Sequence, residues 1–144
     1  MEPTAAAGRF PATRPGDRRA QGPQFSAIVA VRDLDRARDF YGRVLDLELA
    51  SGGDDGPLTF RTGDTVLVVY ASEFAGTNDA NAVVWDMGGK LEAAVADLKA
   101  KGVAFEHYDM EGSTFADGVH WFGEFGAAWF RDPDGNILHL NSGG

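Results

Sequence analysis

Apolar residues recur with two different periods along the first half of the chain, and these periods predict its elements. A β-rich apolar run over residues 24–31 predicts a strand. Apolar residues at helical spacing then predict an amphipathic helix over residues 34–45. Residues 47–50 predict a second strand, and residues 58–71 predict a hairpin.

The second half repeats this order of patterns. Residues 82–87 predict a strand, and residues 91–102 predict an amphipathic helix with a glycine at its C-terminal end. A strand over residues 103–108 and a closing hairpin over residues 127–141 follow, joined by a long connection. Each half therefore has the predicted order β-α-β-β-β.

This repeat predicts a single domain over residues 24–141, made of two modules over residues 24–72 and 80–141. Residues 1–23 are rich in Pro, Ala, Gly and Arg and have no hydrophobic periodicity, which predicts a disordered N-terminal extension. The extension lacks the apolar core of about 7–15 residues that a secretory signal needs. We therefore expect a cytoplasmic protein.

Composition narrows the classes of partner. The formal net charge is −9, which argues against nucleic acid or an anionic membrane surface as a partner. The chain has no cysteine, so disulfides and thiolate metal sites are both excluded. No Gly-x-Ser-x-Gly nucleophile motif, phosphate-binding glycine loop or dinucleotide fingerprint is present. A small molecule is the expected ligand.

The connection over residues 109–124 is longer than most connections within a compact domain. It carries several aromatic residues between glycines, together with His120 and Trp121. It is either a lid over a ligand site, or a dimer contact or an extra strand. The sequence leaves these alternatives open.

The closing hairpin contains the most informative turn. Asp132-Pro-Asp-Gly135 is typical of a tight turn, in which Gly135 supplies a positive φ. We expect the two aspartates to serve the backbone of this turn rather than a reaction. Because alternate residues of a strand share a face, Ile137, His139 and Asn141 should point the same way.

Three segments resemble the vicinal oxygen chelate superfamily, which includes glyoxalase I, extradiol dioxygenases and bleomycin-type resistance proteins. They are Val31–Leu47, similar to its first strand-to-helix signature, Leu91–Val103, similar to its second helix, and Asp132–Asn136, similar to its last turn. The resemblance implies an α+β fold of two βαβββ modules, with mixed sheets curled into a cup and the helices outside. It also implies a homodimer.

The resemblance further implies where a divalent metal would bind. The family positions fall at Ser26, Val68, Ala82 (or Asn81 if the register slips by one) and His139. Valine and alanine side chains cannot bind a metal, and one imidazole with a serine is a poor set of ligands. The metal site is therefore predicted to be degenerate, with no cofactor and with His139 as the one candidate ligand.

A rebuilt metal site is the alternative. Asp86 lies on the predicted cup face of its strand, and it could join His139 and His120 in a new three-ligand set. Without a metal, His139 is either a hydrogen-bonding group of the cavity or a satisfied structural histidine.

By alternation, mainly apolar and aromatic side chains should line the cup. Trp129 is expected to pack under a helix instead. The residues predicted to bind a ligand are Ser26, Ile28, Val68, Tyr70, Ala82, Asp86, His120, Trp121, Phe130 and His139, with Ala30 and Val66 as further lining.

Two functions follow from this site. The first is metal-independent binding of a small aromatic or hydrophobic molecule, as in sequestration by resistance proteins. The second is an enzyme of glyoxalase-like or dioxygenase-like type, with the rebuilt metal site or with His139 and Asp86 as a metal-free acid and base. A solid core without a cavity would exclude the first.

Overall fold

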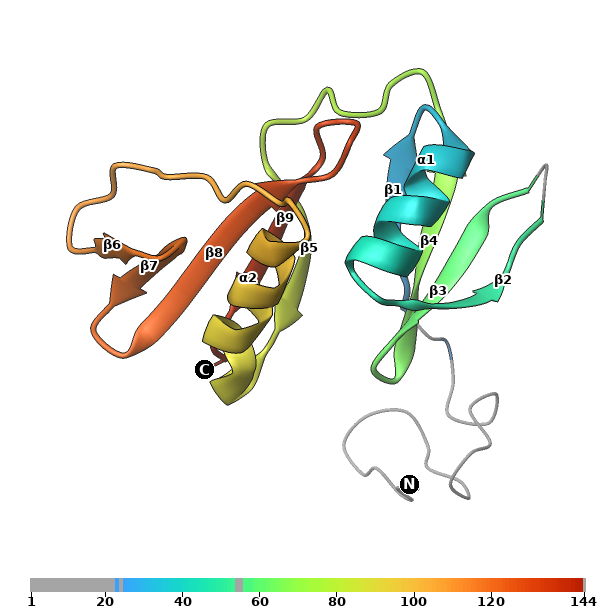
Figure 1. Cartoon of the computed structure of the whole chain (residues 1–144). Coiled ribbons are helices and arrows are strands. Elements are labelled where there is room, and N and C mark those ends of the chain that lie inside the picture. The colour runs from blue at the N-terminus through green and yellow to red at the C-terminus, as the bar shows by residue number, and fades with distance from the viewer. Residues whose placement is uncertain (1–22, 24, 54–55, 144) are drawn as a thin grey trace.

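The structure is a computed structural model that describes residues 23, 25–53 and 56–143. The first module is a four-stranded mixed sheet covered by one helix on one side (Figure 1). Its strand order is β1-β4-β3-β2, and β1 is parallel to β4. Its elements are β1 (Ala27–Val31), α1 (Leu34–Asp39), the π-helical turn η2 (Phe40–Val44), β2 (Glu48–Ser51), β3 (Leu58–Thr62) and β4 (Thr65–Ala71).

The helix of this module begins and packs as the sequence pattern predicts. The Asp33 side chain accepts a hydrogen bond of 3.1 Å from the Arg36 backbone N–H, which caps the helix N-terminus. Ala37, Tyr41 and Val44 are buried against the sheet. The helical spacing of these apolar residues thus fixes the face that the helix presents to the core.

The second module is a five-stranded mixed sheet with the order β5-β9-β8-β7-β6, in which β5 is parallel to β9. One helix covers one side of this sheet as well (Figure 1). Its elements are β5 (Asn81–Asp86), the 3₁₀ turn η3 (Gly88–Lys90), α2 (Leu91–Ala100), β6 (Thr114–Ala116), β7 (Val119–Phe122), β8 (Phe125–Arg131) and β9 (Ile137–Asn141).

The strand predicted over residues 103–108 is wrong. The contacts of this segment with β8 are an isolated bridge between Phe105 and Phe130 and a 2.8 Å hydrogen bond from the Glu106 N–H to the Trp129 carbonyl. The hairpin β6–β7 takes the edge of the sheet instead. Of the alternatives for the connection over residues 109–124, the extra strand is therefore correct.

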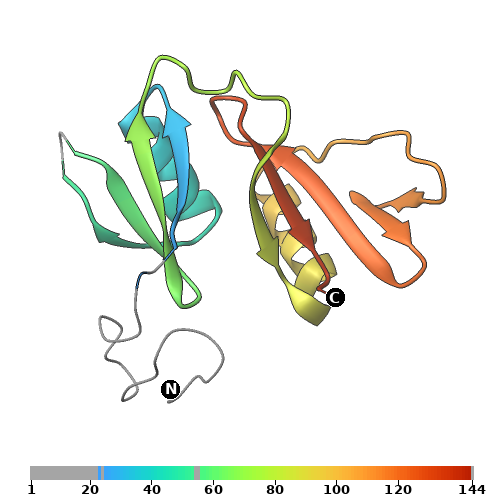
Figure 2. The same ribbon diagram turned by 180° about the vertical axis from the view of Figure 1, so that it is seen from behind.

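The two modules lie side by side with both helices on the same side of the molecule (Figures 1 and 2). Figure 2 shows the opposite side, where neither sheet is covered by a helix, and we call this side the helix-free face. The predicted α+β fold of two modules with external helices is confirmed, and the two sheets do not close on each other. The predicted extension over residues 1–23 falls outside the described residues except for Pro23.

The Asp132–Asn136 turn joins the two modules. The buried Asp132 carboxylate accepts hydrogen bonds from the Tyr41 hydroxyl (2.7 Å), from the Asp134 N–H (2.9 Å) and from the backbone and side-chain N–H groups of Asn136 (2.9 and 2.8 Å). The Asn136 side chain also donates to the carbonyl oxygen of Ala30 in β1 (2.7 Å). Asp132 therefore serves the turn, as predicted. The Asp134 carboxylate does not, because it pairs with the Arg36 guanidinium of α1 at 2.7 Å and so contributes to the junction instead.

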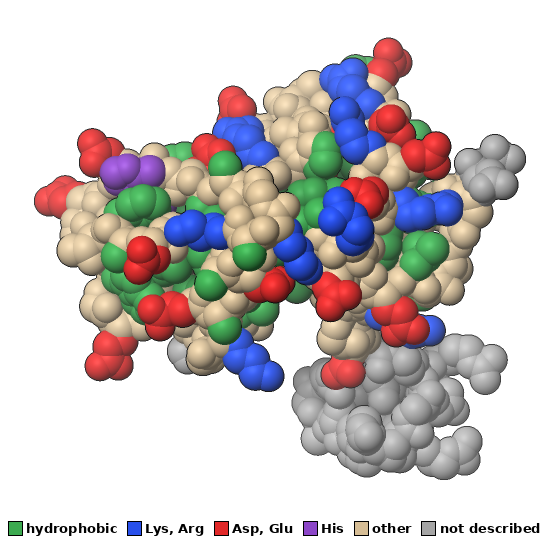
Figure 3. Space-filling view, in the orientation of Figure 1, with side chains coloured by type: hydrophobic (Ala, Val, Ile, Leu, Met, Phe, Trp, Pro, Cys, Tyr) green, Lys and Arg blue, Asp and Glu red, His purple; other side chains and the backbone are tan. Residues whose placement is uncertain are grey.

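Charged side chains of both signs are interspersed over the helix-bearing side of the molecule (Figure 3). None of the helices in the described ranges has the length and apolar character needed to span a membrane.

Candidate functional site on the helix-free face

Strand alternation divides the side chains of each sheet between the core and the helix-free face. In β1 and β4, Val29, Val31, Leu67 and Val69 are buried against the helix. Their neighbours point the other way, so that Ile28 is 61% exposed and Tyr70 39% exposed. Large apolar side chains that gather in the open mark binding surfaces more often than isolated ones do.

In β5 the same alternation holds. Val83 and Trp85 pack against the core, and Ala82, Val84 and Asp86 face away from it, with Val84 56% exposed. Ala82 and Asp86 therefore lie on the same face of β5, as alternation predicts. The apolar part of the helix-free face therefore continues from the first module onto the second.

A groove of about 330 Å³ lies on this side at the junction of the modules. It brings together three of the predicted ligand-binding residues, Ile28, Tyr70 and Ala82. Its size is at the lower end of the range of small-molecule sites. The segment between β4 and β5 forms a further wall that was not predicted from the sequence, and it includes Phe74, Gly76, Thr77, Asn78 and Ala80.

His139 lies on the helix-free face with both ring nitrogens engaged. Its Nδ1 is 3.2 Å from the Ala128 carbonyl oxygen, which can only accept, so Nδ1 carries the proton. Its Nε2 is 3.3 Å from the side-chain amide nitrogen of Asn141, which donates to it. The ring is 9% exposed. Of the two roles left open for His139, these contacts favour the satisfied structural histidine.

The residues at the family's metal positions do not fit a divalent ion. Ser26, Val68 and Ala82 supply one hydroxyl and two hydrocarbon side chains, and His139 has no free lone pair in this arrangement. In the part of the chain that the structure describes, no three His, Asp or Glu side chains come together as a set that could hold a metal. His139, Asp86 and His120 are not brought together as a rebuilt site would require.

Asp86 is likewise engaged elsewhere. Its carboxylate accepts a 2.9 Å hydrogen bond from the Gly88 N–H and so supports the turn after β5. In the register of the sheet, Asp86 lies beside Asn141, while Val84 lies beside His139. Asp86 and His139 therefore do not hydrogen-bond to each other, as a metal-free acid–base pair would.

Two predictions about the last hairpin are wrong, namely those that assigned Phe130 and Trp129 to the two faces of the sheet. Phe130 is fully buried in the core, where its ring is 6.4 Å from that of Phe40 and 5.3 Å from that of Phe105. Trp129 is the residue on the helix-free face, stacked on His139 with 4.7 Å between ring centroids. The reason is the strand register, because Trp129 lies directly opposite His139 and opposite residues share a face.

Two further predicted ligand-binding residues lie away from the groove. His120 is fully buried, its Nε2 accepts a 2.9 Å hydrogen bond from the Tyr108 N–H, and its Nδ1 has no partner in the described chain. The rings of Phe115 and Trp129 surround it at 4.7 and 5.2 Å. Trp121 packs on the helix side of its strand, over Gly126. Neither side chain contacts the groove.

The buried state of His139 makes stability depend on pH. Burial lowers the pKa of His139, and the hydrogen bond to the Ala128 carbonyl opposes this shift only in part. The unfolded chain therefore binds a proton near pH 6.5 that the folded chain takes up only at lower pH. The stability that the neutral, buried His139 contributes to the fold is present above about pH 6.5 and is lost as the pH falls below that value.

We expect urea denaturation to give a larger loss of stability between pH 7.5 and pH 5 for the wild type than for His139→Gln. The glutamine variant retains a hydrogen-bonding side chain but does not titrate. Equal losses in the two proteins would contradict the shift assigned to His139.

Comparison with known proteins places this geometry in context. The model of the Glyoxalase/Bleomycin resistance protein/Dioxygenase superfamily matches residues 24–140. A comparison with curated proteins gave no match. Among solved structures, a glyoxalase/bleomycin resistance protein from Streptomyces sp. CB03234 is 24% identical, with a TM-score of 0.57, and the match covers 81% of this chain and 96% of the other.

Two further solved structures have the same fold at lower identity. The fosfomycin resistance protein FosX from Listeria monocytogenes is 15% identical, with a TM-score of 0.62 and coverage of 85% of this chain and 91% of the other. Lactoylglutathione lyase from Agrobacterium tumefaciens is 18% identical, with a TM-score of 0.59 and coverage of 83% and 92%. At these identities the likeness concerns the fold.

Proposed function

The chain belongs to the glyoxalase, bleomycin resistance protein and dioxygenase superfamily, and from this premise we propose that it binds a small aromatic or hydrophobic molecule on its helix-free face without a metal ion. The observation that carries this proposal is the hydrogen bonding of the His139 ring. The one imidazole at a metal position of the family uses both nitrogens for hydrogen bonds within the protein. A sequestration role of the resistance type follows from such a site.

The lining of the groove supports the class of ligand. Ile28, Tyr70 and Ala82 offer an aliphatic and aromatic surface, and the side chains of Asn78 and Asn81 add polar groups at its side. A flat apolar molecule gains free energy by covering such a surface, at about 25 cal/mol per Å² of apolar area removed from water. The few polar groups would orient it.

As part of this proposal, the protein acts as a cytoplasmic homodimer in which a second copy covers part of the helix-free face. Exposed Val84 supports this arrangement because it extends the apolar surface beyond the groove. The two sheets also leave the site open on one side, where a second chain could complete it.

The binding test uses 2-naphthol and quinoline as flat aromatic probes, titrated by calorimetry in the presence of EDTA. We expect saturable binding to the wild type by at least one probe. Ile28→Asp and Tyr70→Ala should weaken it by about tenfold or more, because they remove apolar contact area from the lining of the groove.

Leu49→Asp is the matched control for this test. Leu49 is 38% exposed, but it pairs with the buried Phe60 and so lies on the helix side of its sheet. Its replacement should change the affinity by less than about twofold. Binding that requires an added metal, or equal losses in Ile28→Asp and Leu49→Asp, would contradict the proposal, as would the absence of binding by both probes.

A further inference from the structure

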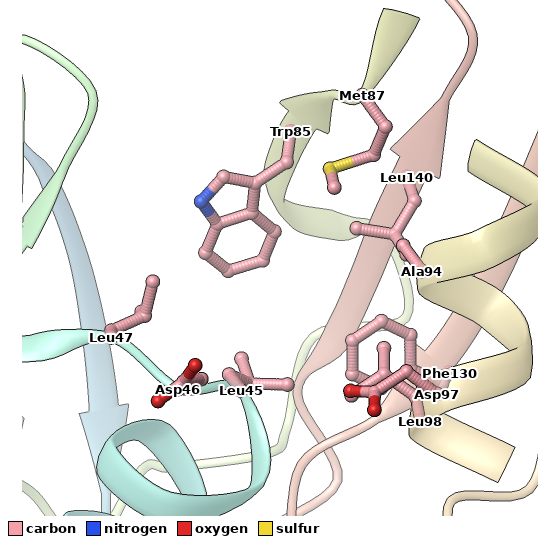
Figure 4. A pocket seen from close by; sticks show the side chains of 10 residues that line it. All are labelled: Leu45, Asp46, Leu47, Trp85, Met87, Ala94, Asp97, Leu98, Phe130 and Leu140. Atoms are coloured by element: carbon pink, nitrogen blue, oxygen red, sulfur yellow. The ribbon is translucent and has the colours of Figure 1, made fainter. Parts of the chain in front are cut away.

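A second hollow lies between the two modules on the helix-bearing side, and we call it the inter-module groove (Figure 4). Its volume is about 310 Å³. The segment after η2 forms one wall, and β5 and α2 form the others. It is lined by Leu45, Asp46, Leu47, Trp85, Met87, Ala94, Asp97, Leu98, Phe130 and Leu140.

This groove is separate from the site on the helix-free face. Trp85 points into it, whereas its strand neighbours Val84 and Asp86 face the other way. Leu140 lines it, whereas His139 lies on the helix-free face. Because alternate residues of a strand point to opposite sides, the second sheet itself separates the two sites.

The floor and walls of the inter-module groove are apolar. Phe130 and Leu140 are buried beneath it, at 0% and 4% exposure. Trp85 and Met87 are half-buried at one end, where their side chains face the hollow (Figure 4). The Trp85 indole is held in place by a 2.8 Å hydrogen bond from its Nε1–H to the Thr62 hydroxyl. The groove thus offers a fixed aromatic surface beside a flexible thioether.

The only charged side chains in the lining are two carboxylates, and they lie at the end opposite to Trp85 and Met87 (Figure 4). Asp97 is paired with Lys101 at 3.3 Å, and the Lys101 ammonium also donates to the Val44 carbonyl at 3.0 Å. Asp46 has no hydrogen-bond or ion-pair partner in the described part of the chain. A carboxylate without a countercharge therefore borders an apolar hollow.

We propose that the inter-module groove binds an amphipathic monocation, an ammonium group attached to an aryl or alkyl body. The apolar body covers Trp85, Met87 and Leu140, while the ammonium pairs with Asp46. An anion of the same shape is repelled by the Asp46 carboxylate. A neutral molecule gains only the apolar contacts. The net charge of −9 attracts cations to the protein as a whole and does not by itself select this groove.

The experiment titrates full-length protein with 4-phenylbutylamine, a primary amine that is protonated at pH 7. Intrinsic tryptophan fluorescence and calorimetry follow the binding. The neutral 4-phenylbutanol and the anionic 4-phenylbutyrate are the matched probes. We expect one saturable site for the amine, at least about fivefold weaker binding of the alcohol and no binding of the carboxylate. Trp85→Phe should remove most of the fluorescence change.

Three variants locate the site. Ala94→Met and Ala94→Phe fill the groove by different amounts, and each should reduce amine binding by about tenfold or more while melting cooperatively. Asp46→Asn should bring the affinity for the amine close to that for the alcohol, whereas Asp35→Asn, on the exposed side of α1, should leave it unchanged. Val84→Asp, which acts on the helix-free face, should also leave the amine affinity unchanged.

Several results would overturn this proposal. Equal affinities for the amine and the alcohol, or an Asp46→Asn variant that binds the amine like the wild type, would remove the role of the carboxylate. Loss of amine binding in Val84→Asp but not in the Ala94 variants would assign the amine to the helix-free face. Absence of saturable amine binding would exclude the site altogether.

Discussion

Replacing Asp132 by alanine is expected to lower the free energy of unfolding by about 3–5 kcal/mol. The Asp132 side chain is 4% exposed. Its removal leaves the buried Tyr41 hydroxyl and the half-buried N–H groups of Asp134 and Asn136 without this acceptor. Burial and the adjacent carboxylate raise the pKa of Tyr41 far above its usual value, so that this phenol is always a donor.

Urea denaturation at pH 7 measures this loss. Tyr41→Phe should cost about 1–2 kcal/mol, since it removes one donor and leaves the remaining bonds of the carboxylate in place. Asp79→Ala, an exposed aspartate between β4 and β5, should change stability by less than about 0.5 kcal/mol. A loss below about 1 kcal/mol for Asp132→Ala would mean that the turn does not hold the modules together.

Gly76→Ala is expected to destabilise the fold by about 3 kcal/mol or more. Gly76 has φ of 72°, a conformation that costs an alanine about 1 kcal/mol. In addition, a methyl group at this position would collide with the backbone carbonyl of Asp134. A backbone atom cannot move aside as the end of a flexible side chain can. Either the segment between β4 and β5 or the Asp132–Asn136 turn must therefore shift.

Substitutions of two other glycines separate the cost of the positive φ from the cost of the collision. Gly63 has φ of 59°, but a methyl group there meets no atom within 4 Å, so Gly63→Ala should cost only about 1 kcal/mol. Gly89 is free of both constraints, and Gly89→Ala should lie within about 0.5 kcal/mol of the wild type. If Gly76→Ala were no worse than Gly63→Ala, the close approach of the two backbones would not contribute to stability.

Much of the fold follows from local patterns in the sequence. The hairpin predicted over residues 58–71 corresponds to β3 and β4, and the turn glycine Gly135 has the positive φ that was expected, 92°. The strand predicted over residues 103–108 did not form. β7 pairs with residues 125–127 of β8, and residues 105 and 106 lie farther along the same edge, beside Phe130 and Trp129. Which segments pair along an edge is a tertiary effect that local propensity does not contain.

The sequence contained information that could have assigned Trp129 and Phe130 to the correct faces. The Asp132 N–H donates to the Asn136 carbonyl, so the hairpin is symmetric about Asp134 and Trp129 faces His139 across it. Counting outward from the turn would have placed Trp129 and His139 on one face. The two grooves had no such signal, because their walls come from segments that only the packed modules bring together.

The central claim is that the helix-free face works without a metal, and metal addition tests it most directly. Protein purified without chelators or an affinity tag would be analysed for bound metal and then melted with added Fe(II), Mn(II), Ni(II) or Zn(II). We predict no stoichiometric metal and shifts of the melting temperature below about 1 °C for every ion, since an ion that does not bind the native state cannot stabilise it. One equivalent of bound metal, or a shift of several degrees with a single ion that disappears in His139→Ala, would contradict the account.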